Sequence, residues 1–248
     1  MYKTPLVEIS TVIQGEGKLA GVPHILLRTT GCDLRCQFKK DSFCDSPHTS
    51  WKPEKGDMGL YDVIEVVKAN PQIKHVMITG GEPTMHSDWL VETCQKLRSE
   101  YGMFITLETA GTNYLTAGVD LLSLSPKLRS SRPIVGTYNP IIKREVTEED
   151  YAKHEAKRRN FMIIRQQLGR ACSYQIKPVC SNEDDLEEIS EFCAVLNIPY
   201  NKVYLMPEGL TDEQLSKSRI WLFGACIKHG YNYTDRLHII TYGDLRGV

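Results

Sequence analysis

The chain has 248 residues, of which 41% are hydrophobic and 25% are charged, a composition typical of a globular protein with one large core. Thirty Lys and Arg residues oppose 31 Asp and Glu residues, so the net charge of -1 excludes the strong basic field of a dedicated nucleic-acid or anionic-membrane binder. No segment approaches the roughly 20 apolar residues of a membrane span, and the start of the chain lacks a signal-peptide pattern. We therefore expect a cytoplasmic protein that binds neither membranes nor nucleic acid directly.

Six short apolar segments are predicted as buried β-strands. They are residues 24–30, 75–79, 103–108, 119–125, 173–177 and 202–206. Helical periodicity predicts helices at 60–69, 87–100, 183–196 and 212–229, and Asn182 and Thr211 are the expected N-caps of the last two. Alternating strands and helices imply parallel strands with right-handed crossovers, so the predicted class is α/β, as a barrel or an open sheet.

Residues 129–170 interrupt this alternation. The portion 145–168 is rich in Lys, Arg and Glu and is predicted to form one charged helix. We interpret residues 129–170 as an arm inserted into a single domain that spans residues 1–248. A solvated face is favoured over a partner-binding surface for this arm.

Glycines and polar residues follow most of the predicted strands at the point where each strand ends. Any one of these segments alone would be interpreted as a turn. The carboxyl ends of parallel strands share one face of the fold, however, so the segments should meet at one ligand site. They are Gly31-Cys32, Gly80-Gly81-Glu82-Pro83, Glu108-Thr109-Ala110-Gly111, Ser125-Pro126-Lys127 and Pro207-Glu208-Gly209. The two glycines before Glu82 allow close approach of a ligand, and the Glu82 carboxylate suits a ligand ammonium group.

The eight cysteines are not expected to form disulfides in a reducing compartment. Five of them lie in helical patterns or lack a nearby ligand and are interpreted as packing residues: Cys94, Cys172, Cys180, Cys193 and Cys226. Cys32, Cys36 and Cys44 instead fall within thirteen residues of irregular loop, which can wrap three thiolates around one metal centre. The spacing leaves two centres open: a zinc site completed by His48, or an iron–sulfur cluster with one iron free.

Taken together, these motifs resemble those of the radical S-adenosylmethionine (SAM) superfamily, through the three cysteines after the first strand and Gly80-Gly81-Glu82-Pro83 after the second. Within it, the chain is similar over nearly its whole length to the 7-carboxy-7-deazaguanine synthases. That closer similarity rests on Ile13-Gln14-Gly15-Glu16-Gly17, Arg28, Cys44-Asp45-Ser46, Thr79, Glu108-Thr109, Ser125-Pro126-Lys127, and the ending from Arg236-Leu237-His238 to Tyr242-Gly243.

The resemblance implies a partial TIM-type barrel of about six parallel strands. It also implies a [4Fe-4S] cluster on Cys32, Cys36 and Cys44, whose open iron binds the amino and carboxylate groups of SAM. The residues that it implies for SAM binding are Phe43, Gly81, Glu82, Glu108, Ser125, Pro126, Lys127, Met206, Pro207, Glu208 and Gly209.

The implied reaction converts 6-carboxy-5,6,7,8-tetrahydropterin to 7-carboxy-7-deazaguanine with loss of ammonia, in queuosine and 7-deazapurine biosynthesis. The implied substrate residues are Gln14, Gly15, Glu16, Arg28 and Thr79. Among them, Arg28 suits the substrate carboxylate and Glu16 suits the donors of its amino-pyrimidine edge. The resemblance further implies Mg²⁺ bound partly by Ser46, where the family more often has threonine, together with a flavodoxin-like reductant and a homodimer.

One departure from the superfamily pattern concerns the cysteine loop. Seven residues separate Cys36 from Cys44, where the superfamily usually has two. Loops tolerate such insertions at modest cost because closure entropy grows slowly with length.

Two other interpretations stay open: an activating enzyme for a glycyl-radical partner, and a non-catalytic zinc-binding interaction protein. The activating enzyme explains Gln14 to Gly17 and Ser125 to Lys127 less well than a synthase does, and the strand-end motifs disfavour the zinc-binding protein.

Overall fold

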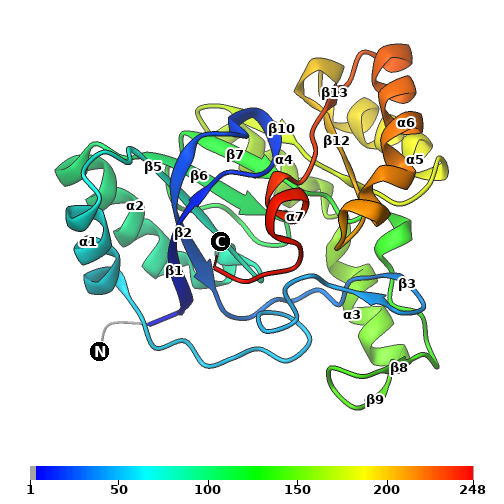
Figure 1. The fold of residues 1–248 in the computed structure, drawn as a ribbon, viewed down its shortest axis with the longest axis horizontal. Helices are drawn as coiled ribbons and strands as arrows, with labels where there is room; N and C mark the ends of the chain where they lie inside the picture. Colours follow the sequence, from blue (N-terminus) through cyan, green and yellow to red (C-terminus); the bar gives the residue numbers. More distant parts are fainter. Residues whose placement is uncertain (1–3, 248) are drawn as a thin grey trace.

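The computed structural model describes residues 4–247. Its centre is a six-stranded sheet in the order β1-β2-β5-β6-β7-β10 (Figure 1). The neighbours from β2 to β10 pair in parallel, whereas β1 is an antiparallel edge strand on β2. These strands are Leu6–Ile13 (β1), Pro23–Thr29 (β2), His75–Gly80 (β5), Phe104–Thr109 (β6), Leu121–Leu124 (β7) and Tyr174–Ile176 (β10).

A second parallel sheet continues the first. It contains Val179–Cys180 (β11), Tyr204–Pro207 (β12) and Asn232–Tyr233 (β13), in that order. A parallel bridge between Ile176 and Val203 joins β10 to the start of β12. The six predicted strands therefore all form and pair in parallel, which confirms the α/β class and is consistent with a partial barrel. The edge strand β1 was not predicted, because its buried face carries Glu8 and Ser10 beside Leu6 and Val12.

Helices cover the outside of the sheets, with α1 and α2 at one end and α5 and α6 at the other (Figure 1). Two buried clusters hold them there. One joins Val67 and Leu90 to the sheet residue Val76, and the other joins Phe192 to Leu205. The helices are Leu60–Ala69 (α1), Ser87–Tyr101 (α2), Glu148–Arg158 (α3), Phe161–Arg170 (α4), Asp184–Leu196 (α5), Asp212–His229 (α6) and Leu237–Tyr242 (α7).

Local capping explains where several helices begin and end. The Thr211 hydroxyl accepts from the Gln214 amide at 3.2 Å at the start of α6, and Gly230, with a φ of 74°, ends that helix. The Asn182 side chain caps the Asp185 amide at 3.3 Å, although α5 begins one residue later than expected. No helix in residues 4–247 combines the length and the apolar composition needed to cross a bilayer.

The predicted single helix at 145–168 is wrong, because the segment forms two helices, α3 and α4. Asn160 separates them, and its side chain accepts from the Ile163 amide at 3.2 Å, which starts a new helix. The rest of residues 129–170 contains a 3-10 turn at Arg129–Ser131 and a short hairpin of Tyr138–Asn139 (β8) and Arg144–Glu145 (β9). Val146 from this segment packs with Phe43 and Trp51 beside the cysteine loop.

Candidate active site

A cavity of about 460 Å³ opens where the parallel strands end, within the size range of small-molecule sites. It collects many of the residues that the sequence singled out. Those that line it are Gln14, Gly15, Glu16, Arg28, Cys32, Cys36, Cys44, Ser46, Thr79, Gly81, Glu108, Ser125, Lys127 and Met206. Phe43, Glu208 and Gly209 line an adjoining cavity of about 70 Å³, while Glu82, Pro126 and Pro207 line neither.

The backbone after β5 lies directly against the start of the cysteine loop. The Gly81 amide donates to the Thr29 carbonyl at 3.1 Å, and the Glu82 amide donates to the Gly31 carbonyl at 2.8 Å. A β-carbon on Gly81 would lie 2.0 Å from the Gly31 carbonyl oxygen, which leaves space for glycine alone. The two motifs thus form one surface of the cavity.

We expect Gly81→Ala to lower the free energy of unfolding of the apoprotein by about 1–3 kcal/mol, because the added methyl group must displace the backbone at Gly31. Urea unfolding measures this loss. Gly224→Ala is the matched control, since Gly224 lies inside α6 with no atom near the added carbon. The control should be stabilised by about 0.5 kcal/mol. An unchanged Gly81→Ala protein would contradict the close contact.

The Glu82 carboxylate does not face the cavity, contrary to its expected role as an acceptor for a ligand ammonium group. The side chain is 0% exposed, and its oxygens accept from the Thr84 and Thr109 hydroxyls at 2.6 and 2.7 Å. They also accept from the Thr84 amide at 3.2 Å and the Ala110 amide at 2.8 Å. Glu82 therefore joins the end of β5 to the end of β6 and supports the backbone that lines the cavity.

The long gap between Cys36 and Cys44 is closed by a hairpin. Gln37–Lys39 (β3) and Ser42–Phe43 (β4) pair in an antiparallel ribbon, so the cysteines that flank it face each other. The Cys44 amide donates to the Cys36 carbonyl at 3.1 Å. Seven intervening residues thus leave the two cysteines as neighbours, because the extra length projects away from them.

Glu208 holds this hairpin. Its carboxylate accepts from the Lys39 ammonium at 2.6 Å and from the Ser42 hydroxyl at 2.8 Å. The Glu208 side chain therefore contacts the hairpin and lines the smaller cavity, and a contact of the 206–209 turn with SAM stays a prediction.

The three thiols fit a metal cluster in both type and placement. All three line the same cavity, and burial raises the pKa of each thiol, that of Cys36 to about 12. The Lys127 charge opposes this effect at Cys36 more strongly than that of Arg35 does. Among residues 4–247, no three His, Cys, Asp or Glu side chains converge on a position for one metal ion.

Opposite charges meet on one side of the cavity. Lys177 lies between two carboxylates, 2.6 Å from Glu16 and 3.0 Å from Glu108, and Arg236 lies 3.0 Å from Glu16 and 2.6 Å from Asp45. Burial would raise the pKa of Glu16, but the charges of Lys177 and Arg236 outweigh it and hold the pKa below its ordinary value. Glu16 is therefore an ionised acceptor at neutral pH.

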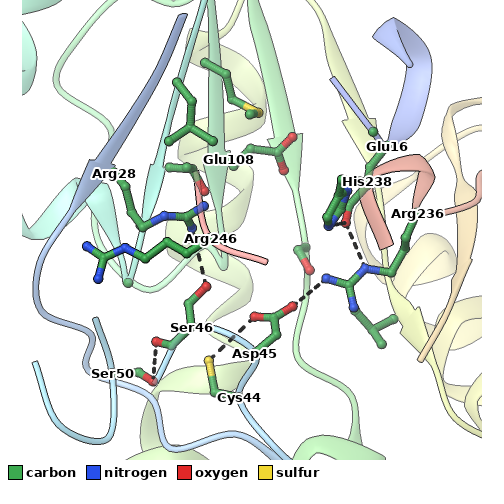
Figure 2. Close-up of a pocket in the computed structure, with 18 of the residues that line it drawn as sticks. Glu16, Arg28, Cys44, Asp45, Ser46, Ser50, Glu108, Arg236, His238 and Arg246 are labelled. Carbon is green, nitrogen blue, oxygen red and sulfur yellow. Dashed lines mark hydrogen bonds and ion pairs between the residues drawn. The ribbon is translucent and has the colours of Figure 1, made fainter. Parts of the chain in front are cut away.

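Two arginines occupy the other side, as Figure 2 shows, and Asp45 and Ser46 lie between the two groups. Arg28 donates to the Glu8 carboxylate at 2.9 Å, and its other edge lies 3.4 Å from the Ser46 hydroxyl. Arg246, from the C-terminal tail, also reaches Glu8 at 3.3 Å. The tail therefore closes the cavity beside Arg28.

The first loop connects this site across the open side of the sheet. The Gly17 and Lys18 amides donate to Thr234 at 2.6 Å and to Gln175 at 2.7 Å, which joins the β1–β2 loop to the last strands. The carbonyl of Gly15 accepts from the Leu237 amide at 3.0 Å and so positions α7. Segments from both ends of the chain thus complete one site.

Sequence reasoning gave no role to several residues that line the cavity: Glu8, Asp45, Lys177, Arg236, His238 and Arg246. Lys177 ends the fifth predicted strand, so the strand-end rule that found the other segments would also have found it. Arg236 and His238 belong to the C-terminal motif of residues 236–243, for which the sequence suggested no binding role. Glu8 and Arg246 carried no sequence signal, because only the tertiary structure brings the two ends of the chain together.

The α/β fold, the strand-end cavity and the three loop cysteines define a radical SAM protein, and the model of the Radical SAM superfamily matches residues 26–193. The crystal structure of QueE from Escherichia coli has the same fold, with a TM-score of 0.63 at 24% identity over 96% of this chain and 94% of that chain.

Two curated relatives narrow the assignment, and both are named 7-carboxy-7-deazaguanine synthase. The protein from Rhodopirellula baltica is 40% identical over 95% of this chain and 85% of its own length. The protein from Halobacterium salinarum is 38% identical over 97% of this chain and 91% of its own. The chain belongs to the 7-carboxy-7-deazaguanine synthase family, a family of radical SAM lyases.

Proposed function

We propose that this chain converts 6-carboxy-5,6,7,8-tetrahydropterin to 7-carboxy-7-deazaguanine, with loss of ammonia, in 7-deazapurine and queuosine biosynthesis. The observation that carries the proposal is the single cavity in which three loop thiols face an arginine and an ionised glutamate. The relatives of the same name, similar over nearly the whole chain, support it. They favour the synthase over a glycyl-radical activating enzyme or a zinc-binding interaction protein.

In this proposal Cys32, Cys36 and Cys44 hold a [4Fe-4S] cluster, and the strand-end segments hold SAM. When bound, the cluster and SAM supply a one-electron cleavage that yields a 5′-deoxyadenosyl radical, which side chains cannot generate. The chain's own task is to bind and orient. Gly81, Ser125, Lys127 and Met206 line the main cavity beside the thiols and are the proposed SAM contacts. Phe43 and Gly209 approach from the smaller adjoining cavity, and Pro126, Pro207, Glu82 and Glu208 support these segments.

The substrate would lie between the two charged sides of the cavity. One edge of the Arg28 guanidinium would pair with its carboxylate. The Glu16 carboxylate would accept from the donors of its amino-pyrimidine edge, which the Gln14 amide would also contact, with Gly15 and Thr79 as walls. Glu108, which the resemblance implies for SAM binding, is proposed here on the substrate side instead, because it shares Lys177 with Glu16 and its carboxylate lies 3.5 Å from the Gln14 amide. Leu26 and Met77 also line the cavity and give it apolar surface.

We further propose that Ser46 contributes an oxygen ligand to Mg²⁺. Its hydroxyl lines the cavity between Asp45 and Arg28, and oxygen is the ligand atom that Mg²⁺ prefers. The Arg28 guanidinium now lies 3.4 Å from that hydroxyl, so the cation and Arg28 would share the site only when an anionic substrate lies between them.

A flavodoxin-like reductant, a homodimer and a cytoplasmic location complete the proposal. The electron that SAM cleavage consumes requires an external donor, which is the reason for proposing the reductant.

For the homodimer, an apolar stripe of Ile220, Phe223 and Ile227 on α6 supports self-association, because these side chains are 84%, 48% and 86% exposed on one helix face.

Product formation tests the proposed function. Anaerobically reconstituted protein, supplied with SAM, reductant, Mg²⁺ and the carboxypterin, is expected to release 7-carboxy-7-deazaguanine, detected by mass spectrometry. An otherwise identical reaction with 6-hydroxymethyl-5,6,7,8-tetrahydropterin is the control, since it keeps the reduced ring but lacks the carboxylate that Arg28 would bind. Protein that carries its cluster and cleaves SAM without forming the deazaguanine would refute the substrate assignment.

A further inference from the structure

His154 is a buried side chain that no step of the proposed reaction uses. It lies on α3 in the arm, is 0% exposed, and accepts at its Nδ1 atom from the Arg35 amide at 3.2 Å. Arg35 directly precedes Cys36 in the cysteine loop. The arm therefore contacts the loop at the residue next to a proposed cluster ligand.

Hydrogen-bond roles fix the orientation of this imidazole. An amide can only donate, so Nδ1 accepts and the ring proton resides on Nε2. Nε2 lies 3.3 Å from the Ser131 hydroxyl, and that hydroxyl donates its own hydrogen to the Leu128 carbonyl at 2.7 Å. Each donor in this chain of hydrogen bonds has a single acceptor, so the imidazole ring has one orientation and one tautomer.

The ends of this chain of hydrogen bonds are two segments of the active site. One end is the cysteine loop, and the other is Leu128, which directly follows Lys127 in the cavity wall. The surroundings keep the imidazole neutral, because burial lowers the pKa of His154 to about 3 despite the nearby Glu155 carboxylate. His154 therefore connects two walls of the cavity through the arm.

Two further contacts hold the loop to the arm on either side of His154. The Ile134 amide donates to the buried Gln37 side chain at 2.8 Å, just after Cys36. The Lys157 ammonium lies 3.4 Å from the Asp33 carboxylate, just after Cys32. His154 and Gln37 are both 0% exposed, and the His154 contact lies between the other two along the loop.

We propose that His154 is a positioning residue that sets the orientation of the Arg35–Cys36 backbone and, through it, the placement of the Cys36 thiolate on the cluster. The proposal rests on the proposed function only in assuming that the cysteine loop binds a [4Fe-4S] cluster. Changing a group that orients a metal ligand typically lowers metal affinity or activity by about 10- to 100-fold. The arm would thereby compensate for the long hairpin between Cys36 and Cys44.

Two substitutions divide the roles of the imidazole. In His154→Asn the side-chain oxygen lies near the position of Nδ1 and can accept from the Arg35 amide, but the Ser131 contact is lost. In His154→Gln the amide group reaches the position of Nε2 and can donate to Ser131, but the Arg35 acceptor is lost. Both variants place an amide in the same buried space, so each is the other's control for stability.

The measurements are iron and sulfide content after anaerobic reconstitution, and the electron paramagnetic resonance spectrum of the reduced cluster with and without SAM. We expect His154→Asn to retain a cluster with a spectrum close to wild type. His154→Gln should bind iron about tenfold more weakly and show an altered spectrum. Thermal midpoints of the apoproteins confirm that both variants fold.

A wild-type spectrum and iron content in folded His154→Gln would overturn the proposal, and so would equal losses in the two variants. Ser131→Ala keeps the imidazole and frees only its Nε2 side, so this variant must retain the cluster better than His154→Gln; the reverse order also overturns it. Cluster-loaded wild-type protein that fails to convert the pterin would refute the proposed function while leaving this test intact, because no readout uses the pterin.

Discussion

We expect Cys44→Ala to abolish the [4Fe-4S] cluster and all SAM cleavage. Cys44 faces the same cavity as Cys32 and Cys36, and the hydrogen bond from its amide to the Cys36 carbonyl places it beside that residue. With two thiolates left, the cluster would have two irons without protein ligands. Anaerobic reconstitution followed by iron and sulfide determination measures the loss, and detection of 5′-deoxyadenosine measures SAM cleavage.

Cys172→Ala is the matched control for this experiment. Cys172 is exposed, so its removal should change neither the cluster nor the stability of the apoprotein. The apoprotein of Cys44→Ala should also keep its thermal midpoint, because the thiol is not part of a large core cluster. A full cluster in Cys44→Ala would mean that another residue is the third ligand and that the hairpin has a different purpose.

The second large effect is expected from Lys177→Met, which removes the cation between Glu16 and Glu108. Lys177 is 3% exposed, and its ammonium lies within 3.0 Å of both carboxylates. Breaking such a buried contact leaves two carboxylates close together, so the free energy of unfolding should fall by about 3 kcal/mol. Displacement of Glu16 should also lower kcat/KM for the carboxypterin by about 10²-fold, because small misplacements in a binding site are costly.

The pH dependence of stability has a definite sign here. The folded-state pKa of Glu16 lies below its ordinary value of 4.5, so its stabilising contribution is fully present above pH 4.5 and is lost as the pH falls. The difference in unfolding free energy between wild type and Lys177→Met should therefore be large at pH 7 and smaller near pH 4. Urea unfolding at the two pH values measures it.

Two further variants make the Lys177 experiment decisive. Lys217→Met removes an exposed partner of Glu213 on α6 and should change stability by less than about 0.5 kcal/mol. Adding Glu108→Gln to Lys177→Met removes one of the two repelling charges and should restore part of the lost stability. If the double variant were no more stable than Lys177→Met, repulsion between Glu16 and Glu108 would not be the cause.

The predicted strands and the strand-end residues agree with the structure for a simple physical reason. In a parallel sheet the carboxyl end of every strand lies on the same face, so segments such as Gly80-Gly81 and Ser125-Lys127 meet without any further information. Buried parallel strands also consist of continuous apolar runs, which are easy to recognise. The edge strand β1 was not predicted because its buried face mixes the apolar Leu6 and Val12 with the charged Glu8.

Side-chain tasks were harder to foresee than positions. Glu82 and Glu208 were expected at ligands, but each carboxylate is occupied by donors from neighbouring segments. A sequence shows that a carboxylate lies near a site, whereas its direction depends on which donors the fold brings within reach. The same reason explains why Lys177 and Arg236 received no role, although both hold Glu16.

The sequence by itself determined the α/β class, the cysteine trio and several of the strand-end segments that line the cavity, because each depends on local pattern and on the direction of parallel strands. Only the tertiary structure decided that a hairpin brings Cys36 beside Cys44 and that His154 from the arm supports that loop. It also decided that the tail residue Arg246 shares Glu8 with Arg28. Such contacts join residues far apart along the chain, and their geometry follows from packing that no local pattern encodes.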